Sequence, residues 1–70
     1  MEKKLVLKGE YITLGQLLKA EGLAESGSDA KVIIQNGEVK LNGEKEIRRG
    51  RKLHEGDEVS FHDTVVKVVR

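Results

Sequence analysis

The chain has 70 residues, with 13 lysines and arginines against 12 aspartates and glutamates, two histidines and no cysteine. A chain this short buries only roughly 60% of its unfolded surface, and the composition disfavours deep enzyme cavities, disulfides and metal sites built from cysteine or histidine. No apolar run approaches the ~20 residues of a membrane span, so we expect one cytoplasmic domain over residues 1–70, without metal, cofactor, membrane contact or small-molecule substrate.

The first part of the chain predicts a strand and then a short helix. An apolar run at residues 4–8 favours the strand. Leucines within residues 14–18 then recur at the spacing of one helix face, and Thr13 and Gln16 have the spacing of a capping box. We expect Gly22 to end this helix after about two turns.

A second helix is expected to begin at a serine and to end at a glycine. Ser26 or Ser28 can cap its first turn, where Asp29 also suits the positive end of the helix dipole. Asn36 and Gly37 supply a left-handed exit. One face of this helix carries the apolar residues Ala30, Ile33 and Ile34, and the other carries the polar stripe Ser28, Lys31 and Gln35.

After the second helix the pattern changes to a period of two, which predicts strands. Asn42 and Gly43 form a strong hairpin-turn signal. Residues 45–51 are polar and charged, with Ile47 as their one inward-facing candidate, and residues 64–69 predict the last strand. We therefore predict an α+β fold, two short helices packed on one side of a small sheet of about four to five short strands.

Positive charge concentrates in the middle of the chain. Residues 31–52 carry seven lysines and arginines against three glutamates, a balance of +4, whereas residues 1–30 and 53–70 have balances of −1 and −2. Three arginines fall within residues 48–51, the tightest basic cluster. Clustered charge attracts a polyanion, and the planar guanidinium group meets two phosphate oxygens at once.

The aromatic and nucleophilic side chains limit which modes of RNA binding and which enzyme activities the chain can support. Tyr11 and Phe61 are the only aromatic residues of the Phe, Tyr and Trp class, whereas platforms that stack unpaired bases need several exposed rings. The residues therefore favour readout of folded RNA through its shape and backbone. Ser60 with His54 and His62 lacks the glycine elbow and oxyanion nest of a nucleophilic site, so we expect no enzyme activity.

A family resemblance points the same way. Residues 26–43 read SGSDAKVIIQNGEVKLNG, with Leu17 and Leu18 before them and GDEV at residues 56–59 after them. This pattern resembles the alpha-L RNA-binding motif, the S-four-type domain named after a small-subunit ribosomal protein, over about residues 12–62. It is similar to stand-alone bacterial proteins of the YaaA- and YbcJ-like group, whose Glu-Ser-Gly…Ala-Lys and Arg-Arg-Gly-Arg-Lys stretches look alike.

The resemblance implies RNA contacts at the start of the second helix, at its exit and in the following hairpin. Many members have an arginine directly after the serine of this helix start, where this chain has Gly27. We expect the basic run at residues 48–52 to compensate. The predicted RNA-binding residues are Ser26, Ser28, Lys31, Gln35, Asn36, Lys40, Asn42, Lys45, Arg48, Arg49, Arg51 and Lys52.

These observations predict a stand-alone RNA-binding module that recognises folded RNA by a helix face and a basic loop. The resemblance implies ribosomal or transfer RNA, and the ribosome or its subunits, as partners. An alternative is a β-grasp-like protein-interaction module whose basic loop meets an acidic partner. A DNA-binding helix-turn-helix is a third interpretation, weakened because the second helix carries a single cation, Lys31, with Asp29 near its start.

Overall fold

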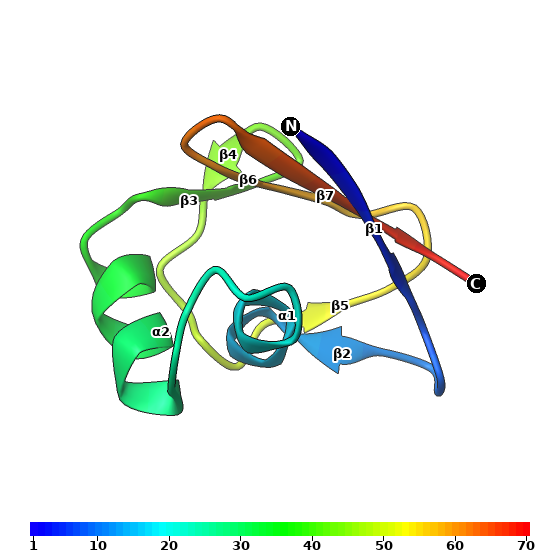
Figure 1. Cartoon of the computed structure of the whole chain (residues 1–70), viewed down its shortest axis with the longest axis horizontal. Helices are drawn as coiled ribbons and strands as arrows, with labels where there is room; N and C mark the ends of the chain where they lie inside the picture. Colours follow the sequence, from blue (N-terminus) through cyan, green and yellow to red (C-terminus); the bar gives the residue numbers. More distant parts are fainter.

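Two helices lie on one side of a mixed five-stranded sheet in the computed structural model, which describes residues 1–70 (Figure 1). In chain order the elements are β1 (Glu2–Val6), β2 (Ile12–Thr13), α1 (Leu14–Ala20), α2 (Gly27–Gln35), β3 (Val39–Leu41), β4 (Glu44–Lys45), β5 (Lys52–Leu53), β6 (Glu58–Phe61) and β7 (Thr64–Val69). The predicted α+β class is therefore confirmed. Neither helix has the length and apolar character that crossing a membrane would require.

The sheet has the strand order β1-β7-β6-β3-β4. Its first and last strands in the sequence, β1 and β7, run parallel to each other, and all other pairs are antiparallel. A separate two-stranded ribbon joins β2 to β5, with Ile12 opposite Leu53. The sequence pattern does not predict β2 and β5 as strands, because two residues are too few to show an alternating pattern. The ribbon fixes the far end of the segment that leaves β4.

Side-chain caps set the helix starts. The Thr13 hydroxyl accepts from the Gln16 amide at 3.3 Å, and the Gln16 side chain accepts from the Thr13 amide at 3.1 Å, which completes the predicted capping box. For α2 the structure decides between the two candidate serines. The Ser26 hydroxyl accepts from the Asp29 amide at 3.1 Å, so Ser26 is the cap and Ser28 lies within the first turn.

The core between the helices and the sheet is aliphatic. Leu14, Leu17 and Ile34 are fully buried, and each contributes about 1.5–3 kcal/mol by its removal from water. Phe61 is only partly buried at the margin. The full core consists of Leu5, Leu14, Leu17, Leu18, Ala24, Ala30, Ile34, Val39, Leu41, Leu53, Val59, Val66 and Val68. Because helices and strands share this core, the loops that join them are held in fixed positions.

The predicted hairpin turn between β3 and β4 is confirmed. Asn42 and Gly43 both have positive φ angles, +51° and +87°, as a type I′ turn requires. The Asn42 side chain donates to the Asp57 carboxylate at 3.0 Å and accepts from the Glu58 amide at 2.9 Å. This residue therefore ties the hairpin to the neighbouring strand β6, in addition to forming the turn.

The prediction that Ile47 faces inward is wrong. Its side chain is exposed, with 58% of the residue's surface accessible, whereas the preceding residue, Glu46, is buried. The Glu46 amide donates to the Val39 carbonyl at 3.1 Å, which continues the contact with β3 beyond β4 and directs the carboxylate inward. Arginines cover that carboxylate, so a charged residue takes the place that hydrophobicity alone would give to isoleucine.

Candidate nucleic-acid interface

Residues 45–52, which we call the basic loop, run alongside α2 on their way from β4 to β5 (Figure 1). Just beyond the C-terminal end of α2, the Lys45 side chain lies against Gly37, with its Nζ 3.2 Å from the position that a Cβ of residue 37 would take. At the N-terminal end of α2, Gly27 and Arg49 line the same hollow, which has a volume of about 230 Å³. The loop thus passes both ends of α2, and its cations lie beside that helix.

The loop is also fixed to the start of α1. The amides of Leu14 and Gly15 donate to the carbonyls of Arg51 and Arg49, at 2.9 and 3.0 Å. These amides have no partner within the helix, so the loop satisfies them. A Cβ at position 15 would lie only 2.7 Å from the Arg49 Cγ. Glycine at this position therefore lets the stem of Arg49 lie directly on α1.

Glu46 binds two of the three clustered arginines. Its carboxylate accepts from Arg48 Nε at 3.0 Å, from a second Arg48 guanidinium nitrogen at 3.1 Å, and from the Arg48 amide at 3.1 Å. A guanidinium nitrogen of Arg51 donates at 3.5 Å. The side chain of Glu46 is 10% exposed, against 66% for Arg48 and 44% for Arg51. The carboxylate is enclosed while both cations still face solvent.

These contacts change the acidity of the groups. The side-chain hydrogen bond from Arg48 is the largest cause that lowers the pKa of Glu46 to about 2, helped by the Arg48 amide and by both positive charges, against the opposing effect of burial. The same hydrogen bond raises the pKa of Arg48. Glu46 and Arg48 therefore both carry their charges at neutral pH.

Arg48 and Arg51 stand between two open hollows. Both arginines line a hollow of about 430 Å³ and a second one of about 630 Å³. The first is also lined by Leu41, Asn42, Glu44, Lys45 and Glu46, and the second by Gly50, Lys52, His54 and Asp57. Leu41 is the one hydrophobic residue among these linings, and the many charged side chains suit a charged, hydrated ligand rather than an apolar small molecule.

Lys52 extends the basic surface toward β2. It lies opposite Thr13 in the β2–β5 ribbon, and its Nζ is 4.9 Å from the centre of the Tyr11 ring. This is a cation–π contact at the surface. Tyr11 is 46% exposed, and the His54 ring lies 6.4 Å from it in a tilted arrangement. The one tyrosine of the chain therefore holds a cation of the basic loop.

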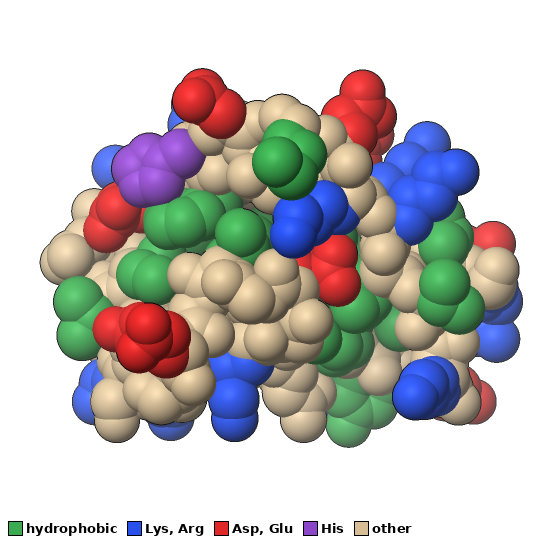
Figure 2. Space-filling view, in the orientation of Figure 1, with side chains coloured by type: hydrophobic (Ala, Val, Ile, Leu, Met, Phe, Trp, Pro, Cys, Tyr) green, Lys and Arg blue, Asp and Glu red, His purple; other side chains and the backbone are tan.

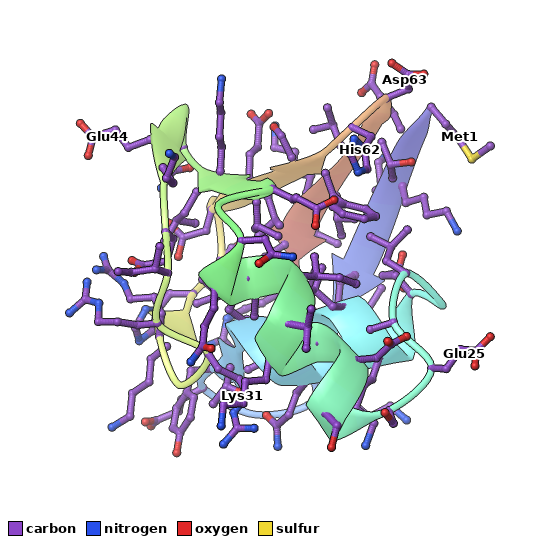
Figure 3. The ribbon with its side chains drawn as sticks, turned by 90° about the vertical axis from the view of Figure 1, so that its left-hand side faces the viewer. Met1, Glu25, Lys31, Glu44, His62 and Asp63 are labelled. Atoms are coloured by element: carbon purple, nitrogen blue, oxygen red, sulfur yellow. The ribbon has the colours of Figure 1, made fainter.

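The exposed face of α2 carries the remaining predicted contacts. Ser28, Lys31 and Gln35 are exposed, and their side chains form no hydrogen bond or ion pair within the protein. In Figure 3, α2 faces the viewer, the basic loop descends on its left, and Lys31 lies low on the same side of the molecule. The helix stripe and the loop thus share one side of the protein.

Among the other predicted RNA-binding residues, Ser26 and Asn42 already form hydrogen bonds within the protein, whereas Asn36 and Lys40 are exposed. The Ser26 hydroxyl is used by the α2 cap, and both polar groups of Asn42 are hydrogen-bonded to the β6 region. Asn36 is the exposed C-cap of α2. Lys40 is exposed on β3, directly opposite Lys45 on β4. The structure therefore brings the lysines of the hairpin close to the basic loop, while Ser26 and Asn42 also have structural roles.

The face seen in Figure 2 carries basic and acidic side chains interspersed with hydrophobic ones, without a patch of a single sign. Beyond the exit of α2, the His62 ring nitrogen lies 2.9 Å from the Glu38 carboxylate. Along the chain, the cations cluster most densely in and beside the basic loop, where five lysines and arginines stand against two glutamates from residue 44 to residue 52.

Sequence reasoning did not identify Glu46 or Gly15 as part of this site. The residue type alone could not predict that Glu46 is buried, since glutamate is almost always exposed unless it is paired. Gly15 did carry a signal, because a glycine inside a helix costs about 1 kcal/mol relative to alanine and so suggests a close approach.

Comparison with known proteins decides the family. The family model described as S4 domain matches residues 5–69. The chain belongs to the S4 domain family. The predicted resemblance to the alpha-L motif is thereby confirmed, and it covers more of the chain than the sequence pattern suggested.

Individual relatives agree with this assignment. YbcJ of Escherichia coli (strain K12) is 44% identical over 62 residues, covering 89% of this chain and 89% of YbcJ. RlbA of Bacillus subtilis (strain 168), named a probable ribosome maturation protein, is 44% identical over 61 residues, covering 87% of this chain and 86% of RlbA. The solution structure of Escherichia coli YbcJ, described as revealing an alphaL motif involved in RNA-binding, superposes with a TM-score of 0.69 at 40% identity, covering 99% of this chain and 86% of that one.

Proposed function

We propose that this S4 domain protein binds folded RNA through one surface, formed by the exposed face of α2 and the basic loop. The observation that carries the proposal is the course of the loop, which passes both Gly37 and Gly27 and so places its cations beside α2. The RNA-binding motif described for YbcJ supports RNA as the ligand, and the name of RlbA supports a ribosomal context.

The surface keeps a positive charge despite the Glu46 pairs. From residue 44 to residue 52, five lysines and arginines stand against two glutamates, a balance of +3. Arg48 and Arg51 use only part of their N–H donors on Glu46, and both remain solvent-accessible. These donors and the lysines contact phosphates, while Ser28 and Gln35 contact 2′-hydroxyl groups of the ribose.

The proposal covers the finer aspects of the function as well. The residues act as one RNA-binding unit without catalysis, in the cytoplasm, and the contacts are the side chains predicted from the sequence. Ribosomal RNA is the first RNA class to test because RlbA bears the name of a ribosome maturation protein. Transfer RNA is the second. Base readout is minor, since the exposed aromatic surface is limited to Tyr11 and the partly buried Phe61.

A charge-matched pair of triple variants tests the proposal. The first replaces Lys31, Lys45 and Arg49 with alanine, which removes one cation from α2 and two from the basic loop but leaves the Glu46 cluster intact. The control replaces three exposed lysines from the β1 and β7 side of the molecule, Lys4, Lys8 and Lys67. Binding of structured ribosomal RNA fragments is measured by titration at several salt concentrations, with duplex DNA of equal length as competitor.

We expect the first variant to bind RNA at least ~10-fold more weakly, with a log–log salt slope shallower by about 2–3 because up to three phosphate contacts are lost. The control is expected to stay within about twofold of the wild type. Equal weakening of both variants would show that total charge, and not this surface, governs binding. Equal affinity for RNA and duplex DNA would contradict folded-RNA recognition, and no RNA binding at all would favour an acidic protein partner.

A further inference from the structure

Glu46 is the only charged residue in the buried set, and it lies beneath two solvent-exposed arginines of its own loop. Three of its hydrogen bonds come from Arg48, two from the guanidinium and one from the backbone amide. A fourth comes from Arg51. The carboxylate therefore fixes the directions of two side chains that would otherwise be long, mobile and free in solvent.

We propose that Glu46 is a positioning residue for RNA, which holds Arg48 and Arg51 as a rigid wall whose free N–H groups contact phosphates in the hollows on either side. This inference rests on the proposed function. The two arginines line both hollows, and no other residue does. The ligand is the phosphate backbone of a folded RNA, which presents phosphates in a fixed arrangement that a rigid pair of guanidinium groups can match.

Rigidity matters because binding has an entropic cost. A solvent-exposed arginine loses rotamer freedom when it contacts a phosphate, and that loss weakens the affinity. An arginine already held by a carboxylate has lost much of that freedom on folding. Glu46 therefore favours binding of a folded RNA even though its own charge repels phosphate. An unstructured polyanion adapts to mobile arginines and gains less from this arrangement.

The inference makes a prediction opposite to that of simple electrostatics. If net charge governs binding, then removing any glutamate from the loop tightens RNA binding. If Glu46 positions the arginines, its removal weakens binding of folded RNA. Glu44 is the matched control, because it is two residues away, exposed, and without an ion pair or side-chain hydrogen bond. Glu46→Gln and Glu44→Gln make the same change in charge, and both keep the size of the side chain.

The experiment compares the two variants on a folded ribosomal RNA fragment and on heparin, an unstructured polyanion. We expect Glu46→Gln to weaken RNA binding by about fivefold, from the rotamer freedom of two released side chains. Glu44→Gln is expected to tighten it slightly, because Glu44 lines the first hollow without holding an arginine. Heparin binding is expected to tighten in both variants. The Arg48 Nε–H signal in NMR spectra, protected in the wild type by its bond to Glu46, should broaden by solvent exchange only in Glu46→Gln.

A second variant keeps the inference falsifiable if Glu46→Gln fails to fold. Arg48→Lys with Arg51→Lys retains both charges but lacks the planar fork, so it is also expected to weaken binding of folded RNA and to spare heparin. Equal tightening by Glu46→Gln and Glu44→Gln would overturn the inference. So would unchanged RNA binding by the lysine double variant. Neither result would affect the proposed function, which is tested separately by the Lys31, Lys45 and Arg49 variant, its lysine control and the duplex DNA competitor.

Discussion

At the scale of single residues, the buried carboxylate of Glu46 determines how the basic cluster is arranged. A buried charge is costly unless it is paired and hydrogen-bonded, and Glu46 receives four hydrogen bonds from Arg48 and Arg51. Removing the Arg48 side chain would leave that carboxylate with only the Arg48 amide and Arg51 as partners, and removing Arg51 would take away the fourth bond. Alanine substitutions of these arginines therefore test stability as well as binding, whereas Lys45 and Arg49 can be changed with the cluster intact.

The acid dependence of stability follows from this site. The pKa of Glu46 is about 2 in the folded protein, below its ordinary value of 4.5, so the unfolded chain binds more protons between these values. The stabilisation is complete above pH 4.5 and is lost as the pH falls toward 2. We expect the difference in unfolding free energy between the wild type and Glu46→Gln to shrink steadily over that range. Urea unfolding at pH values from 6 to 2 measures it, and a constant difference would contradict the assignment.

Residues whose role is local could be predicted from the sequence, and residues whose role depends on distant partners could not. Thr13 and Ser26 cap helices through amides three positions away, so their chemistry is visible in the local pattern. Glu46 acquires its role only because the chain turns it under its own arginines. Ile47 shows the same limit, since hydrophobicity alone predicts the wrong side of the loop.

At the scale of elements, the basic loop is positioned by both helices. The first amides of α1 donate to two carbonyls of the loop, and the two ends of α2 lie beside Lys45 and Arg49. The ribbon of β2 and β5 then fixes the end of the loop below α1. A loop held at so many points keeps its cations in place, which is the condition for recognising a ligand by shape.

Gly15→Ala tests the contact between the loop and α1. The added methyl group meets the Arg49 Cγ, and overpacking of this kind costs about 1–3 kcal/mol. A better helix propensity returns up to ~1 kcal/mol, so we expect a net loss of about 1 kcal/mol in denaturant unfolding, with weaker RNA binding because Arg49 is displaced. Gly50→Ala is the control, because no atom lies within 4 Å of its Cβ position and its φ is not positive. A Gly15→Ala variant as stable as the wild type would count against the contact.

The elements themselves were predictable to different degrees. The first helix follows from its leucine spacing and capping box. The second follows from its apolar spacing, its serine cap and the left-handed exit at Gly37, and the hairpin follows from Asn42 and Gly43. The two-residue strands β2 and β5 have too little pattern for any periodic signal. The parallel pairing of β1 with β7 joins opposite ends of the chain, a contact that no local pattern reveals.

At the scale of the whole molecule, the basic segment of the sequence runs from α2 through the β3–β4 hairpin into the basic loop. The sequence has a near-neutral total of +1 with a basic middle third. The strand order places β4, which leads into the basic loop, at the opposite edge of the sheet from β1. The proposed function assigns RNA binding to this side, where the uneven charge would attract a polyanion despite the small net charge of the protein.

The central claim is the location of one RNA-binding surface, and an NMR titration of the ¹⁵N-labelled protein with a folded ribosomal RNA fragment tests it most directly. Amide shifts are expected to concentrate in residues 26–36 and 40–52, with little change in β1 and β7. Shifts spread evenly over the chain, or concentrated at the β1 and β7 edge, would contradict the claim.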